Sequence, residues 1–213
     1  MTFDIHQIDE LDYSSDDDAE ERFDAYRDDL LELFLASPEY RQHAQKYPNP
    51  GWADSFMDFG FRYLGYSIPT MKVNAVEELV TEILPRKVSL QSREDALDAI
   101  PELVAFWSFI KREYDLRNAD SILKYLNSFS PDKFADSMFD PAKAGMAKSF
   151  FMSGQTAGFD MTDMNQANQY MLLHNANILH HSEQERIAKK ADNEKEKKKR
   201  KAQKTARKRN RKR

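Results

Sequence analysis

Four prolines of this chain directly follow a residue type that caps helices, and these pairs constrain the fold more than any other pattern. Proline is favoured in the first turn of a helix, because its missing N–H would have no partner there in any case. The pairs are Ser37-Pro38, Asn49-Pro50, Ser130-Pro131 and Asp140-Pro141. They predict helices over residues 38–46, 50–64, 131–139 and 141–155.

The spacing of apolar residues predicts the remaining helices. A helix over 18–36 carries an apolar stripe of Phe23, Tyr26, Leu30, Leu31 and Phe34. Further helices are expected over 74–84 and 92–99, from Pro101, from Asn118, and from Thr162 as the cap to about His180. The last of these has an apolar face of Met164, Ala167, Met171, Leu172, Ile178 and Leu179, which we expect to be packed.

Only Lys87–Gln91 is typical of a strand, and an isolated strand has no partner for its backbone. The sequence therefore predicts the all-α class. About eight helices of unequal length, joined by short loops, favour an irregular orthogonal helical bundle.

Composition narrows the classes of function. The chain has 213 residues and no cysteine, which excludes disulfides, zinc knuckles, iron–sulfur clusters and thiol catalysis. No secretory signal and no run of apolar residues long enough to span a membrane is present. We expect a cytoplasmic protein, or a nuclear one in a eukaryote, without a transmembrane segment or a cofactor.

The net charge of −4 is the sum of opposed segments. From Lys195 to Arg213, thirteen residues are lysine or arginine and one is acidic. Residues 1–40 instead hold fourteen acidic and two basic residues. We predict an acidic mobile arm over 1–17, a helical domain over 18–181, and a basic tail over 182–213 that is a frayed helix or disordered.

The basic tail is the strongest functional signal. Its cations can displace the counterions of DNA or RNA, which gives salt-sensitive and sequence-independent binding, and no aromatic residue is present to stack on bases. Its clusters would also serve as a nuclear import signal, an anchor to an anionic membrane surface, or a ligand for the acidic arm. The plainer alternative is a tail that only keeps the chain soluble. The candidate nucleic-acid-binding residues are Lys195, Lys197, Lys198, Lys199, Arg200, Lys201, Lys204, Arg207, Lys208, Arg209, Arg211, Lys212 and Arg213.

Patterns of catalysis and metal binding are not found. The five histidines lack the HExxH spacing, the acidic residues of the arm lack the glycine and glutamate of an EF-hand, and no phosphate-binding glycine loop or GxSxG turn occurs. We assign no catalytic residue and no metal ligand, and these absences favour a protein that is not an enzyme without deciding the question.

Residues 145–161, GMAKSFFMSGQTAGFDM, hold three of the six glycines. Gly154 is predicted to let another helix approach closely, and Gly158 to end the helix in the left-handed conformation. Phe150 and Phe151 are predicted to pack, while the charged end of Lys148 reaches solvent. The alternative is a ligand pocket with Lys148, Gln155 and Asp160 as polar contacts.

The segments ILPRKVSL, ELVAFWSFIKREYDLRNADSILKYL and FDPAKAGMAKSFFMSGQTAGFDM resemble a bacterial all-helical family associated with plasmid and mobile-element proteins. The resemblance covers roughly residues 50–180 and leaves out both charged ends. It implies a helical fold and brings no catalytic residue, because no activity is attached to the family.

Three hypotheses follow for the function. The first is a non-enzymatic helical adaptor or accessory protein that holds nucleic acid or ribonucleoprotein through its basic tail, with a protein partner on the folded surface. The second is a ligand-binding or enzymatic helical domain with a pocket near residues 145–161. The third is a nuclear or ribosome-associated eukaryotic factor.

Overall fold

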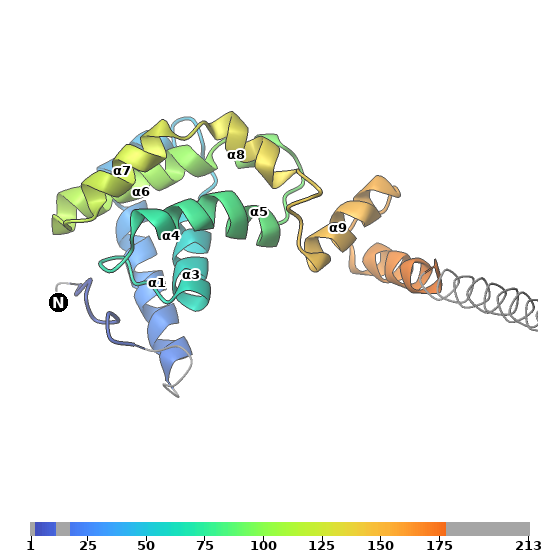
Figure 1. Ribbon diagram of the computed structural model, residues 1–213, viewed down its shortest axis with the longest axis horizontal. Helices are drawn as coiled ribbons and strands as arrows, with labels where there is room; N and C mark the ends of the chain where they lie inside the picture. Colours follow the sequence, from blue (N-terminus) through green and yellow to red (C-terminus); the bar gives the residue numbers. More distant parts are fainter. Residues whose placement is uncertain (1–2, 12–17, 178–213) are drawn as a thin grey trace, which may run out of the picture. The chain divides into compact units, whose positions relative to one another are not determined.

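The fold is described by a computed structural model for residues 3–11 and 18–177. Every regular element in these ranges is a helix, which confirms the all-α class (Figure 1). The chain divides after Met152 into two compact units. The first unit holds most of the helices, and the second is described from Ser153 to residue 177.

Helix α1 (Ala19–Leu35) forms as its apolar spacing predicts. Phe23, Tyr26, Leu30 and Phe34 are buried on one stripe. The ring of Phe23 stacks on that of Phe61, with centroids 4.3 Å apart and planes inclined by 7°. This stacking joins α1 to α3 (Trp52–Leu64).

Residues 3–11, which the sequence places in the mobile arm, are packed against the first unit. Ile5 and Ile8 are buried, and the hydroxyl of Tyr26 donates a hydrogen bond to the carbonyl oxygen of Ile5 at 3.2 Å. Ile5 and Ile8 are three residues apart and give this short segment an apolar face that is buried. Because the residues around them are acidic, the composition of the segment does not indicate that it packs. The arm residues 12–17 lie outside the described ranges.

Two of the four cap–proline pairs begin helices where predicted. In α2 (Pro38–His43) the Ser37 hydroxyl accepts the Tyr40 N–H at 3.1 Å, and in α8 (Pro131–Met138) the Ser130 hydroxyl accepts the Lys133 N–H at 3.4 Å. Each cap satisfies an N–H group that has no partner within its helix.

The pair Asn49-Pro50 does not begin a helix. Helix α3 begins at Trp52, because a distant carboxylate, that of Glu102, accepts the N–H groups of Gly51 and Ala53 at 3.2 and 2.8 Å. The helix ends at Gly65, which has a left-handed φ of 69°.

A continuous helical segment follows and contains one wider turn. It consists of α4 (Val73–Glu78), the π-helix η1 (Leu79–Ile83) and α5 (Leu84–Lys87). Pro85 has no N–H, so the carbonyl of Thr81 lacks its usual donor four residues later. Lys87–Gln91, whose composition is typical of a strand, forms none, because Lys87 ends α5 and residues 88–91 are irregular.

Helix α6 (Ala99–Tyr114) lies at the centre of the first unit and contacts α2, α3, α7 (Ala119–Ser128) and α8. Leu103, Phe106 and Trp107 are fully buried in it. Before it, the helix predicted over 92–99 is only the 3₁₀ turn η2 (Glu94–Ala96). Pro101 lies inside α6, two residues after its start.

The pair Asp140-Pro141 also fails to begin a long helix. Residues 141–143 form a turn, in which the Asp140 carboxylate accepts the Ala142 N–H at 2.9 Å. Helix α9 (Met146–Thr156) begins five residues later than predicted, and the division between the two units falls within it.

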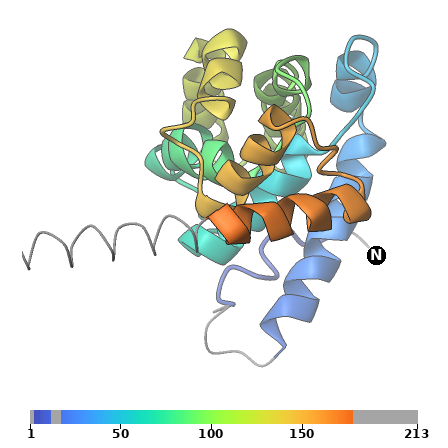
Figure 2. The same cartoon turned by 90° about the vertical axis from the view of Figure 1, so that its right-hand side faces the viewer.

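The last described helix covers residues 164–177 and is drawn in orange in Figure 2. Its cap is Asp163 and not Thr162, because the Asp163 carboxylate accepts the Gln166 N–H at 2.9 Å. Thr162 instead donates its hydroxyl to the Asp160 carboxylate at 2.6 Å. No helix in the described ranges combines the length and the apolar composition that crossing a membrane requires.

Candidate functional site

The thirteen candidate nucleic-acid-binding cations from Lys195 to Arg213 lie outside the described residues, and their assignment stays a prediction. The structure does show the surroundings of the glycine-rich segment 145–161, and it shows the charged and apolar surfaces of both units.

The start of the glycine-rich segment is bound to the end of α5. The Gly145 N–H donates to the carbonyl of Arg86 at 3.1 Å, and the Lys143 ammonium donates to the carbonyl of Thr81 at 2.9 Å. The second acceptor is the carbonyl that Pro85 leaves without its usual donor. A Cβ atom on residue 145 would lie 3.0 Å from the Arg86 carbonyl oxygen, so this close contact favours glycine.

Lys148 completes this attachment. Its ammonium donates to the carbonyl of Pro85 at 2.8 Å and to that of Met138, the last residue of α8, at 2.6 Å. The side chain is only 4% exposed, which corrects the prediction that its charged end reaches solvent. Burial lowers the pKa of Lys148 to about 8.

The other two polar residues of the hypothetical 145–161 pocket belong to the second unit. Gln155 is half-buried, and the Asp160 carboxylate accepts the N–H and the hydroxyl of Thr162 at 2.9 and 2.6 Å. These bonds lower the pKa of Asp160. Lys148 and Asp160 thus each have hydrogen-bond partners within their own unit.

The residue that approaches Gly154 is Met161, and it comes from the loop after α9 rather than from another helix. A Cβ atom on residue 154 would overlap the thioether of Met161. Gly158 has a φ of 87°, in the left-handed region. The N–H groups of Phe159 and Gly158 reach back to the carbonyls of Gly154 and Gln155, both at 3.0 Å, which is the Schellman ending of a helix.

The two phenylalanines of the segment, Phe150 and Phe151, are half-buried on α9. The sequence predicts that the two rings are more buried than Lys148, whereas in the structure Lys148 is more buried than either ring. The largest burial on α9 follows from the attachment of Lys148 to α5 and α8 and not from the aromatic rings.

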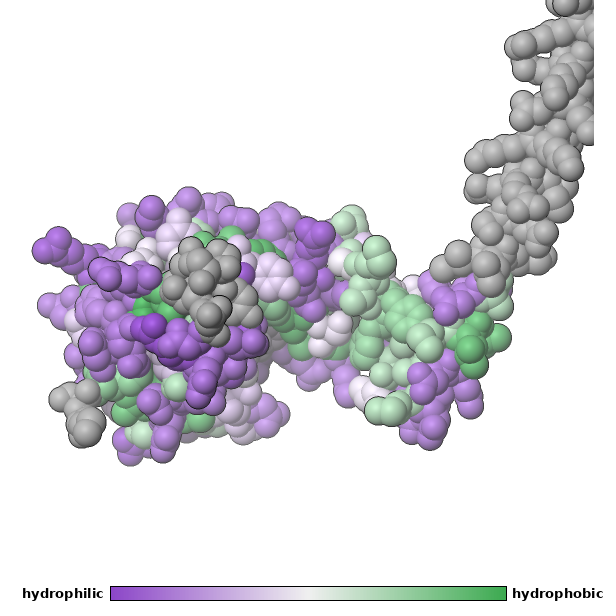
Figure 3. All heavy atoms as spheres, turned by 90° about the horizontal axis from the view of Figure 1, so that it is seen from below, coloured by the Kyte–Doolittle hydropathy of each residue, from purple (hydrophilic) through white to green (hydrophobic). Residues whose placement is uncertain are grey.

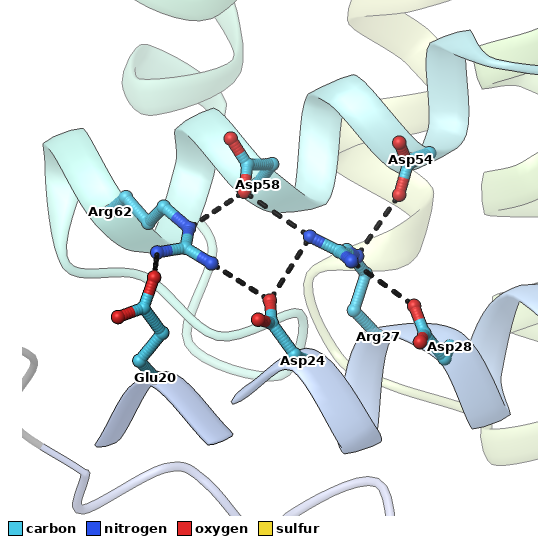
Figure 4. Close-up of polar contacts among 7 residues, drawn as sticks. All are labelled: Glu20, Asp24, Arg27, Asp28, Asp54, Asp58 and Arg62. Atoms are coloured by element: carbon cyan, nitrogen blue, oxygen red, sulfur yellow. Dashed lines mark hydrogen bonds and ion pairs between the residues drawn. The ribbon is translucent and has the colours of Figure 1, made fainter. Parts of the chain in front are cut away.

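A network of ion pairs joins α1 to α3 (Figure 4). Arg62 contacts the carboxylates of Asp58 and Asp24, both at 2.7 Å, and that of Glu20 at 3.0 Å. Arg27 contacts Asp54 at 3.0 Å. The further partners of Arg27 are Asp24, Asp28 and Asp58.

Carboxylates outnumber cations in this network. Five carboxylates surround two guanidinium groups, and the guanidinium carbons of Arg27 and Arg62 lie 5.8 and 5.5 Å from the centre of the Phe23 ring. Burial and the neighbouring carboxylates raise the pKa of Asp54 in spite of its pairing with Arg27. The network holds two helices together, and its excess of negative charge would repel a polyanion.

Glu102 is a fully buried carboxylate that the sequence did not identify. One oxygen accepts the two N–H groups at the start of α3, while the other has no hydrogen-bond partner among the residues that the structure describes. Burial raises the pKa of Glu102. The sequence shows only a glutamate directly before the apolar run LVAFW, which is a weak sign of a buried carboxylate. Its partners, the N–H groups of Gly51 and Ala53, lie about fifty residues away in the sequence.

A hollow of about 380 Å³ lies between α2 and α6. Its wall includes Pro101, Val104 and Ala105, with Lys46 at the polar side. His43 also lines it, and burial lowers the pKa of this histidine. Within the described ranges, no group of three or more histidine and acidic residues has an arrangement that would hold a metal ion.

Comparison with known proteins yields no relative. No family model matches the chain, no curated protein matches it, and no solved structure matches it. The resemblance to a bacterial helical family therefore remains a hypothesis.

Proposed function

We propose that this protein is a non-enzymatic helical adaptor that associates with DNA or RNA, without sequence preference, through its basic C-terminal tail. The observation that carries the proposal is the separation of charge along the chain. The nineteen residues from Lys195 to Arg213 have a net charge of +12, whereas residues 1–194 have a net charge of −16.

The described part of the chain supports the proposal that nucleic acid binds the tail and not the folded residues. Cations on α1 and α3 are enclosed by carboxylates, so the face that they share is not suited to phosphate groups. Lys148 is buried against backbone carbonyls and does not reach a ligand. These cations are therefore not available to a polyanion, which is consistent with binding through the tail.

The absence of cysteine is compatible with a reducing compartment, and we propose a location in the cytoplasm, or in the nucleus if the organism is a eukaryote. The basic clusters of the tail fit either location, because nuclear import and nucleic-acid binding use the same residue types.

Two full-length variants test the proposal. In the first, all thirteen lysines and arginines from Lys195 to Arg213 are replaced by glutamine, and in the second the same nineteen residues are placed in a scrambled order. Binding to random double-stranded DNA and to random single-stranded RNA is measured by fluorescence anisotropy. We expect the glutamine variant to lose binding and the scrambled variant to keep it, because charge and not order provides the contacts.

Unchanged affinity of the glutamine variant would refute the proposal. Loss of affinity in the scrambled variant would refute sequence-independent binding, because it would show that the tail is read in a fixed order.

A further inference from the structure

The hollow between α2 and α6 owes one of its walls to a further turn of the chain after α2. The N–H groups of Lys46 and Tyr47 both donate to the carbonyl of His43 at 3.1 Å, so the chain keeps turning past the end of the helix. Residues three and four apart in such a turn lie on the same side of it. The side chains of His43, Lys46 and Tyr47 accordingly all line the hollow.

A second wall comes from α6 and is apolar. Val104 and Ala105 follow Pro101 by three and four residues, which places all three on one side of the helix. The ring of Tyr47 stacks on that of His43, with centroids 5.3 Å apart and planes inclined by 29°. The volume of about 380 Å³ lies in the range of small-molecule sites, which is about 300–1,000 Å³. The hollow therefore has the size and the lining that suit a small molecule with an aromatic ring.

His43 brings a buried polar atom to this hollow. The residue is only 8% exposed, and its Nε2 is buried without a hydrogen-bond partner among the residues that the structure describes. Burial lowers the pKa of His43, so the imidazole is neutral at pH 7 and carries one N–H. Leaving a buried polar atom unpaired is unfavourable, and a ligand that pairs with this ring gains from it.

The charges on the wall favour an anionic ligand. Glu39 is the carboxylate among the lining residues, and it is already paired, because Arg112 donates to both of its oxygens at 2.7 and 3.2 Å. Lys46 is the cation among them, and it makes no ion pair with any described residue. Its ammonium lies 4.7 Å from the centre of the Tyr47 ring. A carboxylate pairs with an ammonium and also accepts an imidazole N–H.

We propose that this hollow binds a small aromatic carboxylate, with its ring against Pro101, Val104 and Ala105 and its carboxylate at Lys46 and His43. The site belongs to the first unit and is separate from the basic tail. It adds a small-molecule ligand to the proposed adaptor and does not rest on the binding of nucleic acid.

The test is NMR of the ¹⁵N-labelled full-length protein at pH 7 in 0.15 M salt. The probe is sodium benzoate, and benzamide and benzylamine are its neutral and cationic counterparts of similar shape. We expect benzoate to shift the amide signals of His43, Tyr47 and Val104 to saturation, with a dissociation constant at least about fivefold below that of benzamide, because benzamide does not pair with the ammonium. Benzylamine should not shift these signals.

Three variants test the contacts. Lys46→Met removes the ammonium and keeps an apolar side chain, so benzoate should then bind no more tightly than benzamide. Lys124→Met, at an exposed position on α7, is the matched control and should leave the preference for benzoate unchanged. Ala105→Phe fills the hollow and should abolish the shifts by both probes, and circular dichroism checks that it folds.

Other surfaces also attract such a probe, and the position of the shifted signals separates them from the hollow. The apolar face of helix 164–177, which the sequence expects to be packed, is largely exposed, with Met164 80% and Leu172 68% exposed. Figure 3 shows hydrophobic side chains, in green, at the surface near the point where the grey trace leaves. The basic tail attracts benzoate by charge alone.

Shifts confined to that helix or to the tail would overturn the proposal, as would equal binding of the three probes in the hollow. An unchanged preference for benzoate in Lys46→Met would also overturn it. The all-glutamine tail variant should bind benzoate in the hollow as the wild-type protein does. A failure of nucleic-acid binding and a failure of ligand binding therefore give different results.

Discussion

At the residue scale, Lys148 is a buried cation without a carboxylate partner in residues 3–11 and 18–177. Its ammonium is satisfied by two backbone carbonyls, at the ends of α5 and α8. Burial disfavours the charged form, which is why the pKa falls to about 8. The same bonds hold the start of α9 against α5 and α8 within the first unit.

We expect Lys148→Met to lower the free energy of unfolding at pH 7 by about 1–3 kcal/mol, because the Pro85 and Met138 carbonyls lose their donor in a buried site. Urea denaturation measures the change. Lys124→Met, at an exposed position, removes a lysine without touching these carbonyls and should have little effect.

The pH dependence of this difference has a definite sign. The pKa of Lys148 is lowered from 10.5 to about 8, so between these values the unfolded chain binds the proton more tightly than the folded chain does. Relative to Lys148→Met, the wild-type protein should therefore become more stable as the pH rises from 8 towards 10.5. A difference that stays constant from pH 7 to pH 10 would contradict the lowered pKa.

Gly154 offers a second prediction at this scale. In Gly154→Leu the new side chain would collide with Met161, at a cost of about 1–3 kcal/mol for overpacking. The Phe159 amide, which donates to the Gly154 carbonyl, should then exchange its hydrogen faster. The control is Ala157→Leu at a neighbouring exposed position; equal exchange rates in the two variants, or an unchanged melting temperature in Gly154→Leu, would count against a tight contact.

At the element scale, helices with local signals were predictable and helices with distant partners were not. The apolar stripe of α1 and the serine caps of α2 and α8 lie within a few residues of the helix that they define. The start of α3 depends on Glu102, and the start of α9 depends on the Arg86 carbonyl that binds Gly145. A sequence does not display contacts between residues that far apart.

The ion-pair network between α1 and α3 was also not predictable, because acidic residues on a helix such as α1 usually face solvent. We expect Arg62→Gln to lower the free energy of unfolding by about 1 kcal/mol, since Glu20 loses its cation and only Arg27 remains to pair with Asp24 and Asp58. Urea denaturation in 0.05 M and 1 M salt measures this. Salt should reduce the loss, and an equal loss in both would argue that lost packing on Phe23 dominates.

At the scale of the whole molecule, the charge of the chain was readable from the sequence, and its division into two units was not. Met152 and Ser153, where the units divide, lie inside a single helix, and no linker composition marks the place. The sequence identified the apolar residues of helix 164–177 correctly but predicted that they are packed, because periodicity shows which side is apolar and not what covers it.

The tail is a candidate site that rests on the sequence alone. The binding that we propose for it would follow from counterion release, which depends on charge density and requires no folded geometry. The environments of Glu102, Lys148 and the ion-pair network cannot be predicted in this way, because only the fold brings their partners together.

The most direct measurement for the central claim is the salt dependence of binding to random DNA by the full-length protein. If the tail neutralises phosphates, the logarithm of the association constant should fall linearly with the logarithm of the salt concentration, with a slope steeper than about −5, and the all-glutamine tail variant should show no measurable binding. A slope near zero, or the same slope in both proteins, would contradict a nucleic-acid adaptor that binds through its basic tail.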